Sequence, residues 1–150
     1  LPEGRGRGVA VHKSFNSFVA QVIEVSVNAA GKVKVESVHC AVDCGVAVNP
    51  DVIKAQMEGG IGFGLGAVMR NEITFTDGEV DQANFPDYEP LRIKDMPTIS
   101  VHIVHSAQPP TGVGEPGVPP SGPALANAIY AATGNRITQL PMSKQGIEFV

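Results

Sequence analysis

The chain has 150 residues and a formal net charge of −4, with 43% hydrophobic and 17% charged residues, as expected for one globular domain with its own core. The negative charge, the lack of a basic run and the absence of tryptophan argue against a nucleic-acid partner. No stretch approaches the ~18 consecutive apolar residues of a membrane span, so none is expected.

The cysteines and histidines do not form a recognisable metal site. Cys40 and Cys44 fit neither a disulfide framework nor a four-ligand zinc site, and we interpret them as small buried apolar residues. The four histidines are scattered, so no metal-ligating residue is predicted. The chain opens with Leu1 and shows no signal peptide, which suggests a piece cut from a longer protein.

The first third of the chain carries strand patterns. Residues 1–8 form an irregular lead-in, and Ala29–Lys32 with its glycine predicts a hairpin connection. The alternation of apolar and polar residues changes phase near Ser37, which predicts a β-bulge there. We expect an antiparallel meander with one packed face. Its strands are expected over residues 9–13, 18–27 and 33–44.

A helix is expected next, from Pro50 to about Met69. Asn49 is a good cap, and Pro50 suits the first helical position. The second half of this helix contains five glycines, which would cost roughly 4–5 kcal/mol relative to alanine. Close approach of another backbone or of a ligand would offset that cost. These glycines are at positions 59, 60, 62, 64 and 66.

The middle of the chain is expected to contain short strands and a long loop. A strand over residues 72–76 is followed by the turn pair Asp77-Gly78. Residues 84–97 contain three prolines and are expected to form a loop. A loop of that length is usually functional or wraps another surface. A further strand is expected over residues 99–105.

The run from Gly112 to Pro123 holds a single carboxylate, Glu115, among glycine, proline, valine and serine. Proline lacks the amide donor and glycine weakens helices and strands, so this run must be a shaped loop. A helix over about residues 123–133 follows, with Ser121 or Gly122 as its cap and Gly134 at its end. Glu115 is therefore either a site residue on a ligand loop or an ordinary surface carboxylate in a turn.

The fold class is therefore expected to be α+β: an antiparallel meander with two principal helices in a single domain over residues 1–150. The role of Gln56, one turn before the first glycines, stays open between a ligand contact and an ordinary amide hydrogen bond.

Several of these segments together resemble the molybdopterin-containing hydroxylases, the family of xanthine oxidase and aldehyde oxidoreductase. The Gly112–Gly117 run with its following helix is similar to that family's carboxy-terminal signature, and Gln56–Gly60 to an earlier landmark. The subgroup that it resembles most is the large (beta) chain of isoquinoline 1-oxidoreductase. Further matching segments are Asp43–Gly45, Asn49-Pro50, Asn84–Tyr88, Asp95–Pro97 and Arg136–Pro141.

The resemblance implies roles for particular residues. The glutamate of the Gly-x-Gly-Glu loop is the family's catalytic general base in a hydroxylation that takes its oxygen from water, and Glu115 matches it. Gln56 matches the glutamine that contacts the molybdopterin. Gly59, Gly60, Gly114 and Pro116 would border the same cofactor through their backbone. The cofactor implied is molybdopterin in its cytosine dinucleotide form.

The resemblance also implies partners. This chain would be the C-terminal portion of a molybdopterin-binding large subunit, which needs the remainder of that subunit and an iron–sulfur small subunit. Its substrate would be a small aromatic N-heterocycle or an aldehyde. The upstream cofactor segments are missing, so we expect the chain alone to bind no cofactor. The bacterial cytoplasm and periplasm both stay open, since any targeting signal would lie outside this chain.

A second hypothesis belongs to a different class of function. The domain could be a folded, non-catalytic module that is inactive in isolation and acts as a scaffold or interaction surface. Metal analysis of the purified chain separates the two hypotheses.

Overall fold

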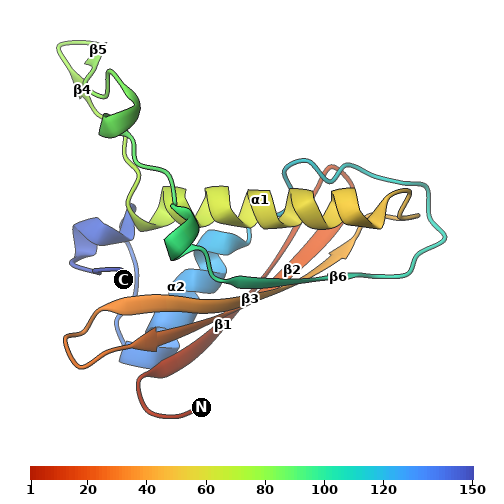
Figure 1. Cartoon of the computed structure of the whole chain (residues 1–150), viewed down its shortest axis with the longest axis horizontal. Coiled ribbons are helices and arrows are strands. Elements are labelled where there is room, and N and C mark those ends of the chain that lie inside the picture. Colours follow the sequence, from red (N-terminus) through yellow and green to blue (C-terminus); the bar gives the residue numbers. More distant parts are fainter.

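A computed structural model of the chain describes all 150 residues and contains a four-stranded sheet in the order β1-β2-β3-β6. β1 pairs antiparallel with β2, and β2 pairs antiparallel with β3, so the predicted meander and the α+β fold class are confirmed. β6 joins parallel to β3, a pairing that the local sequence did not indicate. The strands are β1 (Arg5–Ser14), β2 (Ser17–Val27), β3 (Val33–Asp43) and β6 (Thr98–Ile103) (Figure 1).

The strand bounds differ from expectation mainly at the start. β1 begins at Arg5 instead of residue 9, because Gly6 and Gly8 let this strand lie directly under a helix. The bulge is confirmed: Glu24 faces Ser37 and Val25 faces Val35, which leaves Glu36 as the extra residue of β3.

Two long helices are present. α1 spans Pro50–Met69 as predicted, and the Asn49 side chain accepts hydrogen bonds from the first-turn amides of Asp51 and Val52. α2 spans Ser121–Thr133, so it begins two residues earlier than predicted, with Pro120 at the cap position. Gly134, at φ 75°, ends α2. Neither helix combines the length and apolar character that a membrane span requires.

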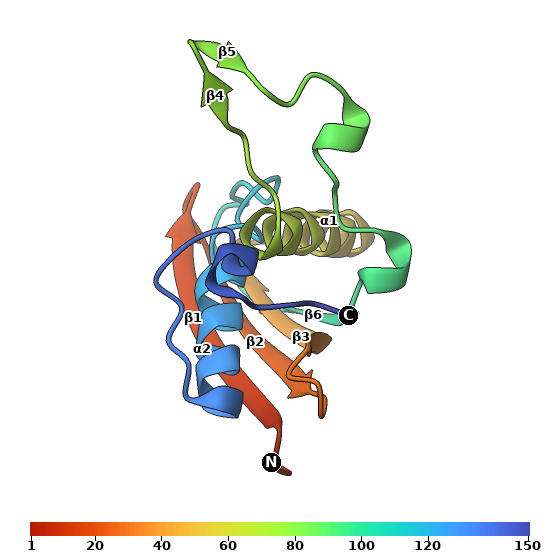
Figure 2. The same ribbon diagram turned by 90° about the vertical axis from the view of Figure 1, so that its left-hand side faces the viewer.

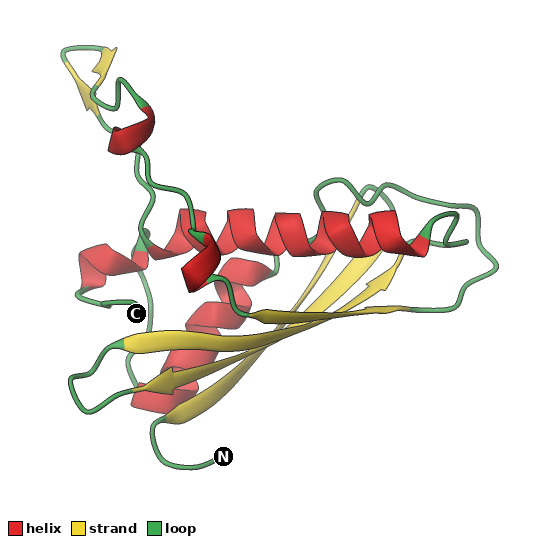
Figure 3. Ribbon diagram, viewed as in Figure 1, coloured by secondary structure: helices red, strands yellow, loops and turns green.

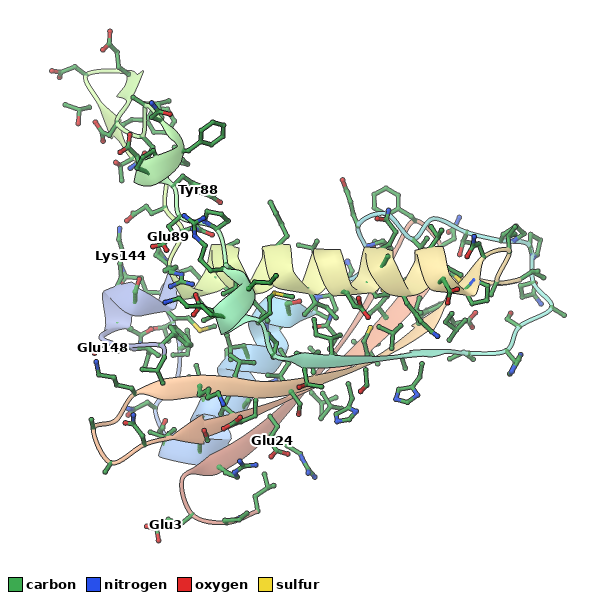
Figure 4. The ribbon with its side chains drawn as sticks, viewed as in Figure 1. Glu3, Glu24, Tyr88, Glu89, Lys144 and Glu148 are labelled. Carbon is green, nitrogen blue, oxygen red and sulfur yellow. The ribbon has the colours of Figure 1, made fainter.

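Both helices pack on one face of the sheet, and Figure 2 shows α1 nearly end-on with α2 and the strands below it. The opposite face is open. Arg5 and Arg7 both donate hydrogen bonds to Glu24 there, which lowers the pKa of that carboxyl, and Figure 4 labels Glu24 on this face. The core between sheet and helices is built from Val19, Ile23, Val25, Val38, Cys40, Val42, Met57, Ile61, Leu65, Leu125, Ala128 and Ile129, among others.

A projecting arm connects α1 to β6 and leaves the body beyond the end of α1 (Figure 1). It contains the two-residue strands β4 (Phe75–Thr76) and β5 (Glu79–Val80), so the strand expected over residues 72–76 is shorter than predicted. Two 3₁₀ turns follow, at Phe85–Asp87 and Ile93–Asp95, inside the expected loop. An ion pair between Arg70 and Asp95, 2.7 Å apart, holds the base of the arm.

The expected end of the strand over residues 99–105 was wrong. β6 ends at Ile103, so His105 lies in a loop instead of a strand. A 3₁₀ turn over Met142–Gln145 follows α2 near the end of the chain. Lys144 in this turn pairs with Glu72 at the base of the arm, and Figure 4 labels Lys144 there.

The glycines of α1 permit close approach on two sides, as the sequence indicated. A Cβ on Gly64 would lie 2.9 Å from the carbonyl oxygen of Val118, and one on Gly60 would lie 3.5 Å from the backbone of Gly117. On another side a Cβ on Gly62 would lie 3.0 Å from the Met96 sulfur. The helix therefore lies against the loop before α2 and against the segment before β6.

The long loop between β6 and α2 passes around the amino-terminal end of α1 (Figure 3). One buried side chain of the sheet holds its far end. Gln21 of β2 donates from Nε2 to the carbonyl oxygen of Gly117 at 2.7 Å. The Ser121 hydroxyl is 3.1 Å from both Gln21 Oε1 and the same carbonyl oxygen. The serine that was expected to cap α2 thus completes a buried polar network.

We expect Gly8→Ala to destabilise the domain. The added Cβ would lie 2.0 Å from the Ala124 carbonyl oxygen and 2.3 Å from the Ala128 amide nitrogen, so α2 must shift away from β1. The free energy of unfolding should fall by about 1–3 kcal/mol or more, measured by urea denaturation. Gly59→Ala is the matched control, because its Cβ would meet nothing within 4 Å. It should be neutral or stabilising by up to ~1 kcal/mol, and equal losses in both variants would contradict the close-approach argument.

We also expect Gln21→Leu to destabilise the domain. The change removes the amide that donates to the buried Gly117 carbonyl and leaves the Ser121 hydroxyl, 3.1 Å away, as the remaining donor to that carbonyl. The loss of one such hydrogen bond costs about 0.5–1.5 kcal/mol. The exposed Gln108 is the control, and Gln108→Leu should change the free energy of unfolding by no more than ~0.5 kcal/mol. If Gln21→Leu is as well tolerated as the control, Gln21 does not hold the loop.

Candidate functional site

A cavity of about 580 Å³ opens between α1, the turn joining β1 to β2, and the loop before α2. Three segments that are far apart in the sequence therefore meet at one place. Its lining consists of Ser14, Phe15, Gln56, Gly59, Gly60, Phe63, Gly114, Glu115, Val118 and Pro119.

Most of the residues singled out in the sequence lie on this cavity. Glu115 and Gly114 line it from the loop, and Gln56, Gly59 and Gly60 line it from α1. A Cβ on Gly114 would lie 3.6 Å from the Gln56 amide nitrogen, so loop and helix are close neighbours here.

Pro116 is placed differently. It is buried and is not part of the lining, whereas Gly114 is. Its expected contact with a cofactor stays a prediction.

The loop that carries Glu115 is fixed on both sides of this residue. Upstream, the Thr111 amide donates to the Cys44 carbonyl at 2.9 Å, and the Ser17 hydroxyl donates to the Gly112 carbonyl at 2.6 Å.

Downstream of Glu115, the Val118 amide donates to the Glu115 carbonyl at 2.9 Å. The Gln21 hydrogen bond to Gly117 completes the anchoring, so the carboxylate extends from a positioned backbone.

Glu115 is the only ionisable side chain in the lining. It is exposed to the cavity side, and none of the ion pairs of the chain involves it. A carboxylate without a competing cation can accept a proton from a group in the cavity, which is what a general base requires.

α1 contributes a polar and an aromatic side chain to the cavity on one helical face. Gln56 and Phe63 are seven residues apart, which is about two helical turns, so both point the same way. Gly59 and Gly60 lie between them and leave the backbone uncovered. An amide beside bare backbone suits a flat polar ligand that approaches the helix closely.

The sequence reasoning did not name five of the lining residues as site residues: Ser14, Phe15, Phe63, Val118 and Pro119. Ser14 and Phe15 lie in the unassigned stretch between the strands expected over residues 9–13 and 18–27. Phe63 is an exposed aromatic residue among the glycines of α1, and that exposure becomes visible only once the buried face of the helix is known.

The two cysteines have no role at this site. Burial raises the pKa of Cys40 to about 12, and burial with the neighbouring Asp43 charge raises the pKa of Cys44. Both side chains thus stay protonated thiols at neutral pH, which makes them poor nucleophiles. The structure also brings no three histidine, cysteine, aspartate or glutamate side chains together as a metal site.

The chain is similar to several known proteins, and one family model matches most of it. Residues 3–97 match the family model described as "Molybdopterin cofactor-binding domain". The chain is 39% identical over 140 residues to the beta chain of isoquinoline 1-oxidoreductase from Brevundimonas diminuta, covering 93% of this chain and 18% of that protein. It is 30% identical over 129 residues to the large subunit of nicotine 6-hydroxylase from Paenarthrobacter nicotinovorans, covering 78% of this chain and 15% of that protein.

Solved structures are similar as well. The aldehyde oxidoreductase of Desulfovibrio gigas superposes with a TM-score of 0.70 at 28% identity, over 83% of this chain and 14% of that chain. Quinoline 2-oxidoreductase of Pseudomonas putida 86 superposes with a TM-score of 0.70 at 21% identity, over 89% of this chain and 17% of that chain. This similarity supports the fold. The chain thus spans less than a fifth of the length of these relatives. On the family match and the relatives together, the chain belongs to the molybdopterin cofactor-binding domains of the xanthine oxidase family.

Proposed function

We propose that this chain is the C-terminal part of a molybdenum hydroxylase subunit and that Glu115 is its general base. The observation that carries the proposal is the convergence of Glu115, Gln56 and three glycines on one cavity. The substrate class that fits is a small N-heterocycle or an aldehyde, the compounds named for the relatives. The reaction would be a hydroxylation with oxygen from water.

The residues present fit the cofactor that the family implies. The Ser14 hydroxyl is buried without a hydrogen-bond partner, the Gln56 amide is exposed, and glycines open the wall beside it. These groups suit a pterin, which is flat and rich in donors and acceptors. When bound, the molybdenum cofactor, here proposed in its cytosine dinucleotide form, supplies two-electron redox chemistry.

The chain's own residues would then have distinct tasks. The Gln56 amide would hydrogen-bond the cofactor, and the backbone at Gly59, Gly60 and Gly114 would let it approach. The Glu115 carboxylate would take a proton at one of its oxygens and so raise the nucleophilicity of the attacking oxygen. The anchors at Gly112 and Gly117 would hold that carboxylate in position.

The proposal includes partners outside this chain. The remainder of the large subunit would complete the cofactor site, since this chain spans about 18% of the Brevundimonas relative. An iron–sulfur subunit would carry the electrons away.

Glu115→Gln in the complete enzyme should abolish most turnover and leave the fold intact. Glutamine keeps the size and shape of the side chain but cannot take a proton. The rate should therefore fall by about 10²–10⁴, which corresponds to roughly 3–5 kcal/mol of barrier. Molybdenum content and melting temperature should stay near normal, because the shape of the loop comes from its backbone anchors.

Glu58→Gln is the matched control. Glu58 is an exposed carboxylate on α1 near the cavity but outside its lining, and its loss should leave the rate unchanged. Turnover, bound molybdenum and melting temperature are measured on the same preparation. Near-normal turnover of Glu115→Gln with full metal would refute the catalytic role, and joint loss of metal and stability would indicate a structural one.

The alternative is a folded module without catalytic function of its own. We expect the purified 150-residue chain to carry no molybdopterin and to hydroxylate neither a quinoline-type heterocycle nor an aldehyde, because the rest of the site lies outside it. Metal analysis by mass spectrometry measures the first point. Stoichiometric molybdenum or detectable turnover would show that these residues complete a site alone.

A further inference from the structure

The turn between β1 and β2 is attached directly to the loop that carries Glu115. The Gly112 amide donates to the Phe15 carbonyl at 3.3 Å, and the Ser17 hydroxyl lies 2.6 Å from the Thr111 hydroxyl. A Cβ on Gly112 would lie 3.0 Å from the Phe15 Cβ, so the two backbones are in contact. Turn and loop form one unit on the cavity wall.

Phe15 has an unusual backbone for a bulky residue. Its φ is 51° and that of Asn16 is 61°, as in the two-residue turns that favour Asn or Gly at such positions. A large side chain with positive φ is strained, and strain of this kind is often retained for function.

The Phe15 ring gains little from packing. It is 61% exposed and lines the same cavity as Gln56, Phe63 and Glu115. Neither core burial nor turn geometry therefore explains a phenylalanine at this position, whereas contact with a ligand does.

Ser14, the preceding residue, supplies a second and independent observation. Its hydroxyl oxygen is buried and has no hydrogen-bond partner in the protein, and the residue lines the cavity. Buried polar groups are nearly always satisfied, so an unsatisfied one at a cavity wall points to a partner that binds there.

We propose that the β1–β2 turn is a ligand-contacting wall of the site. The Phe15 ring packs against a planar conjugated ring, and the Ser14 hydroxyl rotates about the Cα–Cβ bond to hydrogen-bond a polar atom of the same ligand. The inference rests on the proposed function, which supplies two rings of this chemistry: the pterin of the cofactor and an N-heterocyclic substrate. An aliphatic aldehyde has no such ring and would gain nothing from Phe15.

The first test is Phe15→Asn in the complete enzyme. Asparagine tolerates positive φ, so the turn should keep its shape while the ring is lost. The melting temperature of enzyme expressed in a host that cannot make the cofactor should be unchanged or higher. Phe85→Asn is the matched control, because Phe85 is 91% exposed on the projecting arm, away from the cavity.

The readouts distinguish the two rings. If Phe15 faces the substrate, the apparent affinity for isoquinoline, measured as substrate or by thermal-shift titration, should fall about two- to tenfold. Pterin content, measured by fluorescence after release, and the response to propionaldehyde should not change. If Phe15 faces the cofactor, pterin content should fall instead.

The second test is Ser14→Ala. Removal of an unpartnered hydroxyl should not lower the melting temperature of the cofactor-free enzyme, but the rise in melting temperature on cofactor loading should be smaller than in the wild type. This readout needs no turnover. It also keeps the proposal testable if Phe15→Asn folds poorly.

The proposal is overturned if isoquinoline affinity and pterin content in Phe15→Asn both match those of Phe85→Asn. It is also overturned if both cofactor-free variants at the turn melt lower with ligand binding unchanged, because the two residues would then be structural. These results do not test the proposed function itself. Normal turnover of Glu115→Gln would contradict the proposed function, whatever results the Ser14 and Phe15 variants give.

Discussion

A buried hydrogen bond from Gln21 of the central sheet to the Gly117 carbonyl anchors the loop two residues beyond the candidate base. The loop before α2 consists largely of glycine and proline, which gives it few side chains with which to anchor itself. Gln21 supplies the anchor from below, and Ser121 at the start of α2 completes it. A polar side chain inside the core destabilises the fold unless its polar atoms are hydrogen-bonded, as they are here. The same hydrogen bonds therefore stabilise the core and position the loop of the site.

The glycines of α1 leave room for the same loop on its other side. They lower the intrinsic stability of the helix but bring its backbone within contact distance of Gly117 and Val118. Larger residues at positions 60 and 64 would push the loop, and Glu115 with it, away from Gln56. The helix is therefore shaped more by what must lie beside it than by its own propensity.

Local patterns predicted the three meander strands, the β-bulge, α1 and the Glu115 loop, because each depends on alternation, capping or turn chemistry within a short window. They did not predict the parallel pairing of β6, since its partner lies some 60 residues earlier. The early start of β1 was missed because Gly6 and Gly8 weaken a strand pattern unless a helix lies on them. Ser14 and Phe15 were missed for a similar reason: nothing near a hairpin turn in the sequence says which distant loop it will touch.

The separation in sequence between the parts of the cavity has a consequence for the order of folding. The hairpins β1–β2 and β2–β3 close over short loops, but the side-chain hydrogen bonds that tie the Glu115 loop and the start of α2 to β2 join residues 94 to 100 positions apart. Contacts of that span carry the largest loop-closure entropy and form slowly. The cavity is thus expected to be among the last regions of the chain to become ordered, on a sheet that is already assembled. Molecules that have finished the sheet but not the loop would have a stable core and no site.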